Sequence, residues 1–200
     1  RQILKGIRQK HTGYYWFIGL PGTGKTLLLY DLAMKLSGRQ KVCLIHCGRA
    51  GKEWRILHER LRRIDYLSDE QIHENMDLSE YNGVLIDEAH LLSEENLQMI
   101  LQACGQQPVI FSSDCEDMIS PEELDRSTVK AMRHLPEMQT YHLTNRIRTN
   151  AELSSFIQHM MHLPKQRYAR NYPHITVFYA NDEIEAENLL CDARRQGYFY

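Results

Sequence analysis

The 200-residue sequence has no long hydrophobic run and almost no net charge. A membrane-spanning helix needs roughly 18–20 consecutive apolar residues, and the longest apolar stretch, around Val84, is much shorter. We therefore expect no membrane partner. The net charge of -2 provides no overall attraction to nucleic acid, so any basic binding surface must be local. The apolar content of 42% and charged content of 25% are typical of a globular protein.

The cysteines lack the paired CxxC spacing of many structural metal sites. Their odd number, five, favours reduced thiols and a cytoplasmic location. Cys43, His46 and Cys47 are close enough in sequence to suggest a metal site, but their segment has the pattern of a buried strand in which thiols simply pack. The chain begins without Met and ends in apolar residues. We expect a fragment of a longer protein with further domains.

Short apolar runs alternate with longer amphipathic ones, a pattern typical of βαβ units and a parallel sheet. We expect strands at 14–18, 42–46, 83–86, 108–112 and 139–143, and helices at 25–36, 52–64, 93–104 and 121–134. A polar stretch is expected at 68–80. A second series follows, with helices at 150–162 and 182–195 around a strand at 175–179. Because one strand cannot form a sheet alone, residues 149–200 either add to the first domain or, as we predict, begin a second, truncated domain.

The clearest motif is the run Gly19-Leu20-Pro21-Gly22-Thr23-Gly24-Lys25-Thr26, between a predicted strand and a predicted helix. Glycines allow the tight turn of a P-loop, whose N–H groups and helix N-terminus suit phosphate oxygens. In such a loop Lys25 reaches the β- and γ-phosphates and the Thr26 hydroxyl contacts Mg²⁺. The sequence therefore predicts ATP and Mg²⁺ as cofactors. The predicted nucleotide contacts in this segment are Gly19, Pro21, Gly22, Thr23, Gly24, Lys25, Thr26 and Leu27.

Two carboxylates follow the apolar run at 84–86. Asp87 is placed to hold the Mg²⁺ shell, and Glu88 to orient or deprotonate the attacking water. A Glu directly after the metal-binding Asp distinguishes hydrolases from proteins that only hold a nucleotide. The pair therefore favours ATP hydrolysis, with Lys25 and Glu88 as catalytic residues.

These motifs resemble those of helicase-like ATPases with RecA-type domains. Residues 87–90 spell the Asp-Glu-Ala-His box of helicase superfamily 2, but the Ser-Ala-Thr segment of that superfamily is missing. Superfamily 1 has Gly-Asp-x-x-Gln after the next strand, and Ser113-Asp114 matches it in part, with Asp117 in place of Gln. Residues 143–149 are similar to the superfamily 1 segment Leu-x-x-Asn-Tyr-Arg-Ser, with Arg148 on its arginine. The chain most resembles bacterial ATPases related to the Schlafen helicase-like domain.

The resemblance implies an α/β, RecA-like P-loop NTPase domain over residues 1–148, with a mostly parallel sheet. It implies Mg²⁺-dependent ATP hydrolysis coupled to nucleic acid, with Asp114 at the nucleotide. Arg148 would contact the γ-phosphate across the domain cleft as a third catalytic residue. A Gln upstream of the loop contacts adenine in such proteins, so Gln2 either binds adenine or is an ordinary surface residue.

A basic segment follows the second predicted strand, where helicase-like proteins place a strand-contacting motif. Arg49 and Lys52 are therefore candidates for contacts with single-stranded DNA or RNA, although Trp54 and the rest of the segment read as an ordinary helix. His90 either couples the nucleotide site to a partner or is a hydrogen-bonded residue at a strand end. Two other functions stay open. One is a nucleotide-switched regulatory or defence module without translocation, and the other is an ATP-binding platform with little turnover.

Overall fold

The chain is described from a computed structural model, which covers residues 7, 12–38, 40–48, 61–114, 128–143, 152, 155–156 and 172–197. Gln2, Arg49, Lys52, Asp117 and Arg148 lie outside these ranges. The chain divides into two units, 1–148 and 149–200. Each unit is described by itself.

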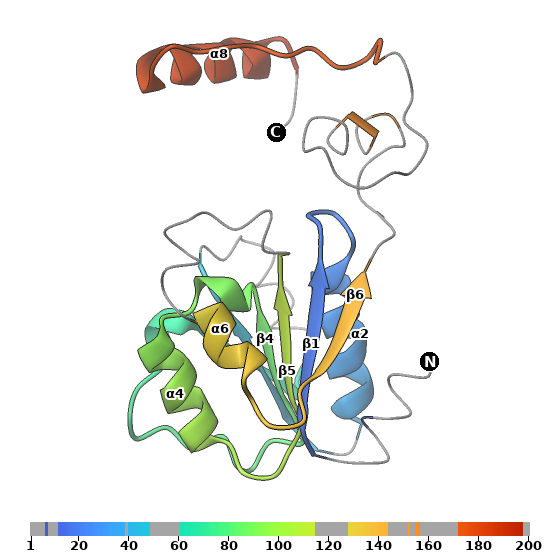
Figure 1. Ribbon diagram of the computed structural model, residues 1–200, viewed down its shortest axis with the longest axis vertical. Helices are drawn as coiled ribbons and strands as arrows, with labels where there is room; N and C mark the ends of the chain where they lie inside the picture. The colour runs from blue at the N-terminus through green and yellow to red at the C-terminus, as the bar shows by residue number, and fades with distance from the viewer. Residues whose placement is uncertain are drawn as a thin grey trace. The chain divides into compact units, whose positions relative to one another are not determined.

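Unit 1 contains a parallel sheet of six strands in the order β3-β2-β4-β5-β1-β6. The strands are β1 (Tyr14–Gly19), β2 (Val42–His46), β3 (Ile64–Ser68), β4 (Val84–Asp87), β5 (Val109–Ser113) and β6 (Gln139–Leu143). Figure 1 shows the central arrows pointing in one direction. Parallel strands require crossover connections, which place helices on both faces of the sheet. This explains why β2 and β4 are almost wholly apolar.

Two hydrophobic cores lie on opposite faces of the sheet. Successive side chains of a strand point to opposite faces, so Trp16 of β1 enters one core while Tyr15 and Phe17 enter the other. Helices α4 (Glu94–Ala103) and α6 (Thr128–Arg133) cover the Trp16 side, and α2 (Lys25–Leu36) covers the other (Figure 1). Each fully buried apolar side chain stabilises the fold by about 1.5–3 kcal/mol.

The described part of unit 1 also contains two short 3₁₀ helices. The short helices are η1 (Asp69–Gln71), after β3, and η2 (Ala89–Leu91), after β4. Helix α4 begins after Ser93, whose hydroxyl accepts a hydrogen bond from the Asn96 N–H at 3.0 Å. Such a cap satisfies one of the backbone donors that the first turn leaves unpaired. Glu94 and Glu95 in that turn also suit the positive end of the helix.

The α/β fold with a parallel sheet is confirmed. Strands 42–46 and 139–143 and helix 25–36 have the predicted bounds, and the other central strands and the helix at 93–104 differ by one residue at either end. The prediction around Ile64 is wrong, because β3 begins there instead of a helix ending. β3 lies at the edge of the sheet, and Ile64 is its only buried residue, so it lacks the apolar run of a central strand. Residues 52–60 and 121–127 of the predicted helices lie outside the described ranges.

The described part of unit 2 contains one long helix, α8 (Glu183–Arg195), as the sequence predicts. Asp182 caps it by accepting a hydrogen bond from the Glu185 N–H at 2.8 Å. The strand predicted at 175–179 is wrong, since these residues are not in a strand and Val177, Phe178 and Tyr179 are exposed. A strand requires a neighbour for its backbone groups, and the described part of unit 2 contains none. Most of the predicted helix at 150–162 lies outside that part.

The helices in the described ranges include none that is long and apolar enough to cross a membrane.

Thiol alkylation tests the core. Burial raises the pKa of Cys43 and of Cys104 to about 12, and it also raises the pKa of Cys47. The thiolate is the reactive form, so iodoacetamide at pH 8 is expected to modify the exposed Cys191 and to spare these three. Peptide mass spectrometry measures the labelling, and the guanidinium-unfolded protein, in which all should react, is the control. Native labelling of Cys43 as fast as Cys191 would contradict the buried assignment.

Candidate functional site

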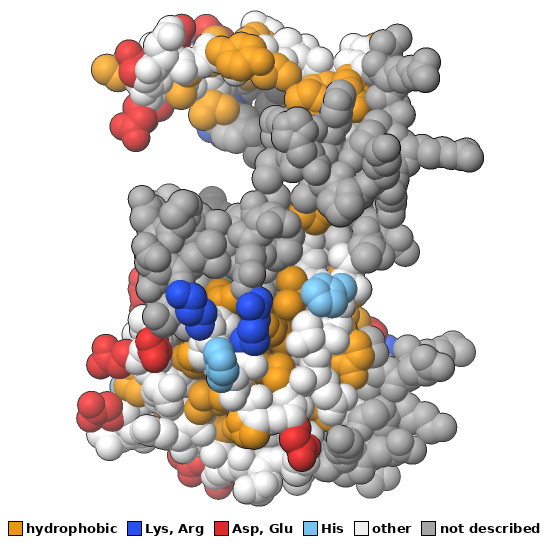
Figure 2. All heavy atoms as spheres, viewed as in Figure 1, with side chains coloured by type: hydrophobic (Ala, Val, Ile, Leu, Met, Phe, Trp, Pro, Cys, Tyr) orange, Lys and Arg blue, Asp and Glu red, His pale blue; other side chains and the backbone are white. Residues whose placement is uncertain are grey.

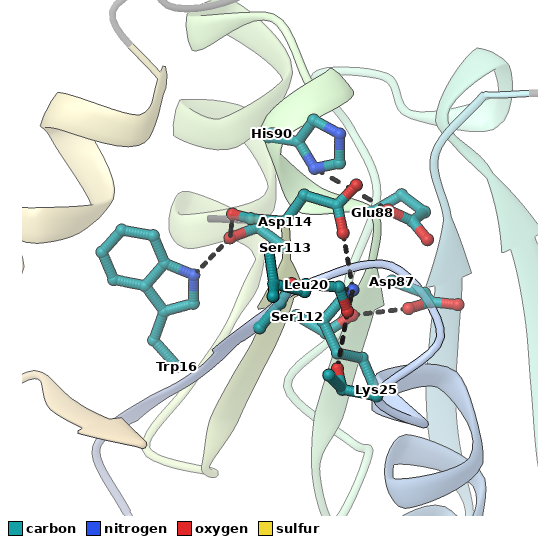
Figure 3. Close-up of polar contacts among 11 residues, drawn as sticks. Trp16, Leu20, Lys25, Asp87, Glu88, His90, Ser112, Ser113 and Asp114 are labelled. Atoms are coloured by element: carbon teal, nitrogen blue, oxygen red, sulfur yellow. Dashed lines mark hydrogen bonds and ion pairs between the residues drawn. The ribbon is translucent and has the colours of Figure 1, made fainter. Parts of the chain in front are cut away.

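The carboxyl ends of neighbouring parallel strands meet at one edge of the sheet, where ligands of open α/β sheets bind. β1 ends there at Gly19, β2 at His46, β4 at Asp87 and β5 at Ser113. Figure 3 shows the polar side chains of β4 and β5 converging on the 19–26 loop, which connects β1 to α2. This edge of unit 1 is the candidate site.

The shape of the 19–26 loop depends on its glycines. A Cβ atom on Gly19 would lie 2.7 Å from the Thr23 hydroxyl and 2.8 Å from the Leu143 carbonyl oxygen, so no side chain fits there. Gly22 and Gly24 have φ values of 80° and 83°, in the left-handed region that glycine adopts without strain. Thr23 is buried, and its hydroxyl donates to the Leu20 carbonyl at 2.8 Å. These constraints hold the loop against the first turn of α2.

Lys25 begins α2 and lies almost fully buried at the loop. Its ammonium donates to the carbonyl oxygens of Gly19 at 3.1 Å and Leu20 at 3.3 Å, and forms an ion pair with Asp114 at 2.6 Å (Figure 3). The side chain is 5% exposed. A buried ammonium is costly without anionic or hydrogen-bonding partners. In this structure the Asp114 carboxylate is its anionic partner.

Asp87 is the most deeply buried carboxylate of the site, at 1% exposure. The Ser112 hydroxyl donates to its Oδ1 atom, and Nδ1 of His46 lies 3.7 Å from its Oδ2 atom. Burial raises the pKa of Asp87, but polar contacts with His46, Ser112 and Thr26, together with the charge on His46, lower it below its ordinary value. Asp87 is therefore ionised at neutral pH.

The next residue, Glu88, lies in a different environment from Asp87. Its backbone is left-handed, with φ 53°, and its side chain is 30% exposed, so water reaches it. Burial raises the pKa of Glu88, as do the charges of Asp87 and Asp114, while Lys25 and His46 partly offset the effect. Glu88 thus binds a proton more readily than an ordinary glutamate.

A pocket brings most of the predicted site residues together. It is lined by Pro21, Gly22, Gly24, Lys25, Thr26, Glu88 and Asp114. Gly19 and Thr23 shape the loop without lining the pocket, and the half-exposed Leu27 is not in the lining either. Gln2 and Arg148 lie outside the described residues, so their roles stay predictions.

The site contains oxygen donors of the kind that Mg²⁺ prefers. Within the described part of the chain, the buried Oδ2 atom of Asp87 has no hydrogen-bond partner of normal length. The Thr26 hydroxyl lies among the polar neighbours of this carboxylate and also lines the pocket. A hard divalent cation would satisfy both oxygens, so the residues present fit Mg²⁺.

The alternative metal site at Cys43, His46 and Cys47 is not supported. Cys43 and Cys47 both pack in the hydrophobic core on the Trp16 side of the sheet, while His46 approaches Asp87. The candidate metal cluster that the described residues form is a different one, Glu88, His90 and Asp114. His90 lies 3.8 Å from the carboxylate of Glu88, one of the residues that line the pocket.

His46 and Ser112 are functional-site residues that the sequence analysis missed in this role. Each is a polar residue at or next to the end of an otherwise apolar strand, and this was the available signal. A third contact fixes the end of β5, where Trp16 Nε1 donates to the Ser113 hydroxyl at 2.9 Å and that hydroxyl donates to the Asp114 carbonyl at 3.0 Å (Figure 3). These contacts hold the strand ends that carry the charged residues.

A local basic surface lies away from the pocket lining. Helix α6 carries the exposed residues Lys130 and Arg133 in its last turn. Figure 2 shows Lys and Arg side chains gathered over this helix, among apolar and uncharged atoms. The basic residues predicted to contact nucleic acid, Arg49 and Lys52, lie outside the described ranges.

Comparison with known proteins gives one family and several structural neighbours. A model of the Schlafen group 3 DNA/RNA helicase domain matches residues 15–198. A search of curated proteins finds no match. The arterivirus nonstructural protein 10 helicase, solved in complex with DNA, has a TM-score of 0.52 and 18% identity, covering 90% of this chain and 49% of that chain.

Two further structures have lower scores. The Hef helicase domain of Pyrococcus furiosus has a TM-score of 0.47 and 14% identity, covering 71% of this chain and 38% of that chain. The flagellar accessory protein FlaH of Methanocaldococcus jannaschii has a TM-score of 0.45 and 14% identity, with 66% and 73% coverage. The chain thus spans less than half the length of the two helicase chains.

Replacing Glu88 with Gln is expected to stabilise the nucleotide-free protein at neutral pH. Because the folded state raises the pKa of Glu88, its ionised form costs folding free energy that a neutral amide does not. The gain should be complete above the raised pKa and should vanish below the ordinary value of 4.5. Thermal unfolding between pH 4 and pH 8 measures it, with Glu74→Gln at an exposed position between η1 and β4 as the control. A lower melting temperature for Glu88→Gln at pH 7 would show that the ionised Glu88 carboxylate does not destabilise the folded protein.

Proposed function

The chain belongs to the family of Schlafen group 3 DNA/RNA helicase domains, and we propose that it binds ATP with Mg²⁺ and hydrolyses it. The observation that carries this proposal is the convergence of one buried ammonium, Lys25, and two carboxylates, Asp87 and Glu88, at a glycine-built loop. Phosphoryl transfer requires positioned positive charge, a metal ligand and a group that orients water. These residues supply all three.

The phosphates would bind to the 19–26 loop and the N-terminus of α2. The helix dipole and the Lys25 ammonium both favour negative charge at this position. Thr26 and Asp87 would hold Mg²⁺, which when bound neutralises charge on the β- and γ-phosphate oxygens. Asp114 would release Lys25 when phosphate arrives, because both anions compete for the same ammonium group.

Glu88 would accept a proton from the attacking water. Its raised pKa increases its basicity, and its partial exposure lets water reach the carboxylate. Asp87, with a lowered pKa, stays ionised beside it and suits the metal. We propose Arg148 as the residue that adds positive charge at the γ-phosphate, and Gln2 as an adenine contact.

Coupling to nucleic acid belongs to the full-length protein in this proposal. The family description supports it, and Arg49 and Lys52 are the proposed contacts with single-stranded DNA or RNA. The chain spans less than half of the helicase chains it resembles, so translocation would require further domains. The alternative is an ATP-switched regulatory or defence module without translocation.

Glu88→Gln is expected to keep ATP binding and to lower turnover by about 10²–10⁴-fold, because a positioned general base contributes that much. Phosphate release and binding of a fluorescent ATP analogue, both with Mg²⁺, measure the two quantities. Glu95→Gln, which removes an exposed carboxylate from α4, should change neither. An unchanged rate for Glu88→Gln would remove Glu88 from the role of base. Failure of the wild-type protein to bind ATP would overturn the proposed function as a whole.

Single-stranded nucleic acid is expected to raise the ATPase rate of the full-length protein severalfold. In a motor, strand binding and hydrolysis are coupled, so the affinity for the strand should in turn depend on the nucleotide. Steady-state turnover with and without single-stranded DNA or RNA, and strand binding with and without an ATP analogue, measure both directions. If neither polymer raises turnover nor binds in an ATP-sensitive way, the motor role fails and the regulatory module becomes the better description.

A further inference from the structure

Two strands each supply one polar side chain to a carboxylate on the strand between them. β2, β4 and β5 lie side by side in the sheet. His46, the last residue of β2, is the direct register partner of Asp87, the last residue of β4. On the other side of β4, β5 contributes Ser112. The parallel register therefore brings His46 and Ser112 to Asp87 from opposite sides.

Each oxygen atom of the Asp87 carboxylate faces a different one of these two side chains. The Ser112 hydroxyl donates to Oδ1 (Figure 3), and Nδ1 of His46 lies 3.7 Å from Oδ2. All three side chains are enclosed, with 12% exposure at His46, 1% at Asp87 and none at Ser112. Tilting the carboxylate plane away from this position would lengthen the Ser112 hydrogen bond and move the other oxygen away from His46. The two contacts together thus select one orientation of the carboxylate.

His46 lies apart from the residues proposed to contact ATP. It does not line the pocket that Lys25, Thr26 and Glu88 line, so it is not in position to take a proton from water there. Its neighbour is the carboxylate proposed to hold the metal. Residues that orient a metal ligand in this way typically change metal affinity by about 10–100-fold when they are replaced.

We propose that His46 is a positioning residue for the metal ion, holding the Asp87 carboxylate in the orientation that binds Mg²⁺. The inference rests on the proposed function and deepens it, because it gives His46 of β2 the role of orienting a metal ligand. It predicts that loss of the Nδ1 contact weakens binding of the Mg²⁺–nucleotide complex, while binding of the nucleotide without metal is unaffected. A role in packing alone would affect both to the same degree.

Two amide substitutions separate the Nδ1 contact from size and polarity. The side-chain nitrogen of Asn can take the place of Nδ1 of the imidazole, whereas that of Gln corresponds to Nε2. His46→Asn therefore keeps a side-chain nitrogen near Oδ2, and His46→Gln removes it from that place. His73→Gln, at an exposed histidine between η1 and β4, controls for the substitution itself. Thermal unfolding of each variant reports whether the fold is retained.

The experiment titrates the 200-residue chain with Mg²⁺ and measures binding of a fluorescent ATP analogue, with a parallel series in EDTA. His46→Gln is expected to raise the Mg²⁺ concentration for half-maximal binding by about 10–100-fold. His46→Asn and His73→Gln should remain close to wild type, and all variants should bind the analogue equally in EDTA.

Each other result overturns a specific claim. If wild-type binding depends on Mg²⁺ and His46→Gln titrates as wild type does, His46 has no role at the metal. If His46→Asn and His46→Gln lose binding equally with and without metal, the residue is structural. If wild-type binding does not depend on Mg²⁺, the proposed metal site itself is wrong, and the inference fails with it.

Discussion

The parallel alignment of the strands is the constraint on which the rest of this structure depends. Parallel strands cannot be joined by tight hairpins, so the chain crosses over between them and the helices cover both faces of the sheet. The same alignment brings the carboxyl ends of β1, β2, β4 and β5 to one edge. Polar residues at those ends are close to each other and largely buried. The site is therefore a direct consequence of strand direction.

Burial at that edge makes every charge depend on a neighbour. Lys25 is 5% exposed and would be strongly unfavourable without Asp114 and the carbonyl oxygens of the loop. Asp87 is buried more deeply still and is held by Ser112 and His46. The contacts that offset the cost of burying these charges are thus the same contacts that orient the charged groups.

Adjacent residues in one chain acquire opposite acid–base properties here. Asp87 and Glu88 are consecutive, yet the pKa of the first is lowered and that of the second is raised. Asp87 has polar partners that favour its ionised form, whereas Glu88 faces two other carboxylates, Asp87 and Asp114. Pairs of titratable groups whose environments separate their pKa values are a common basis for dividing roles in catalysis. The proposed metal ligand and the proposed base follow this division.

The sequence alone determined the features that depend on local patterns. Continuous apolar runs identified the central strands, because burial on both faces leaves no alternation, and the glycine spacing identified the 19–26 loop, because only glycine adopts φ near 80° without strain. Tertiary structure decided the rest. β3 and the segment 175–179 could not be predicted correctly. An edge strand has a weak apolar pattern, and residues 175–179 have no partner strand in the described part of unit 2. The contacts of His46 and Ser112 with Asp87 depend on the strand order β2-β4-β5, which brings together residues that are far apart in the chain.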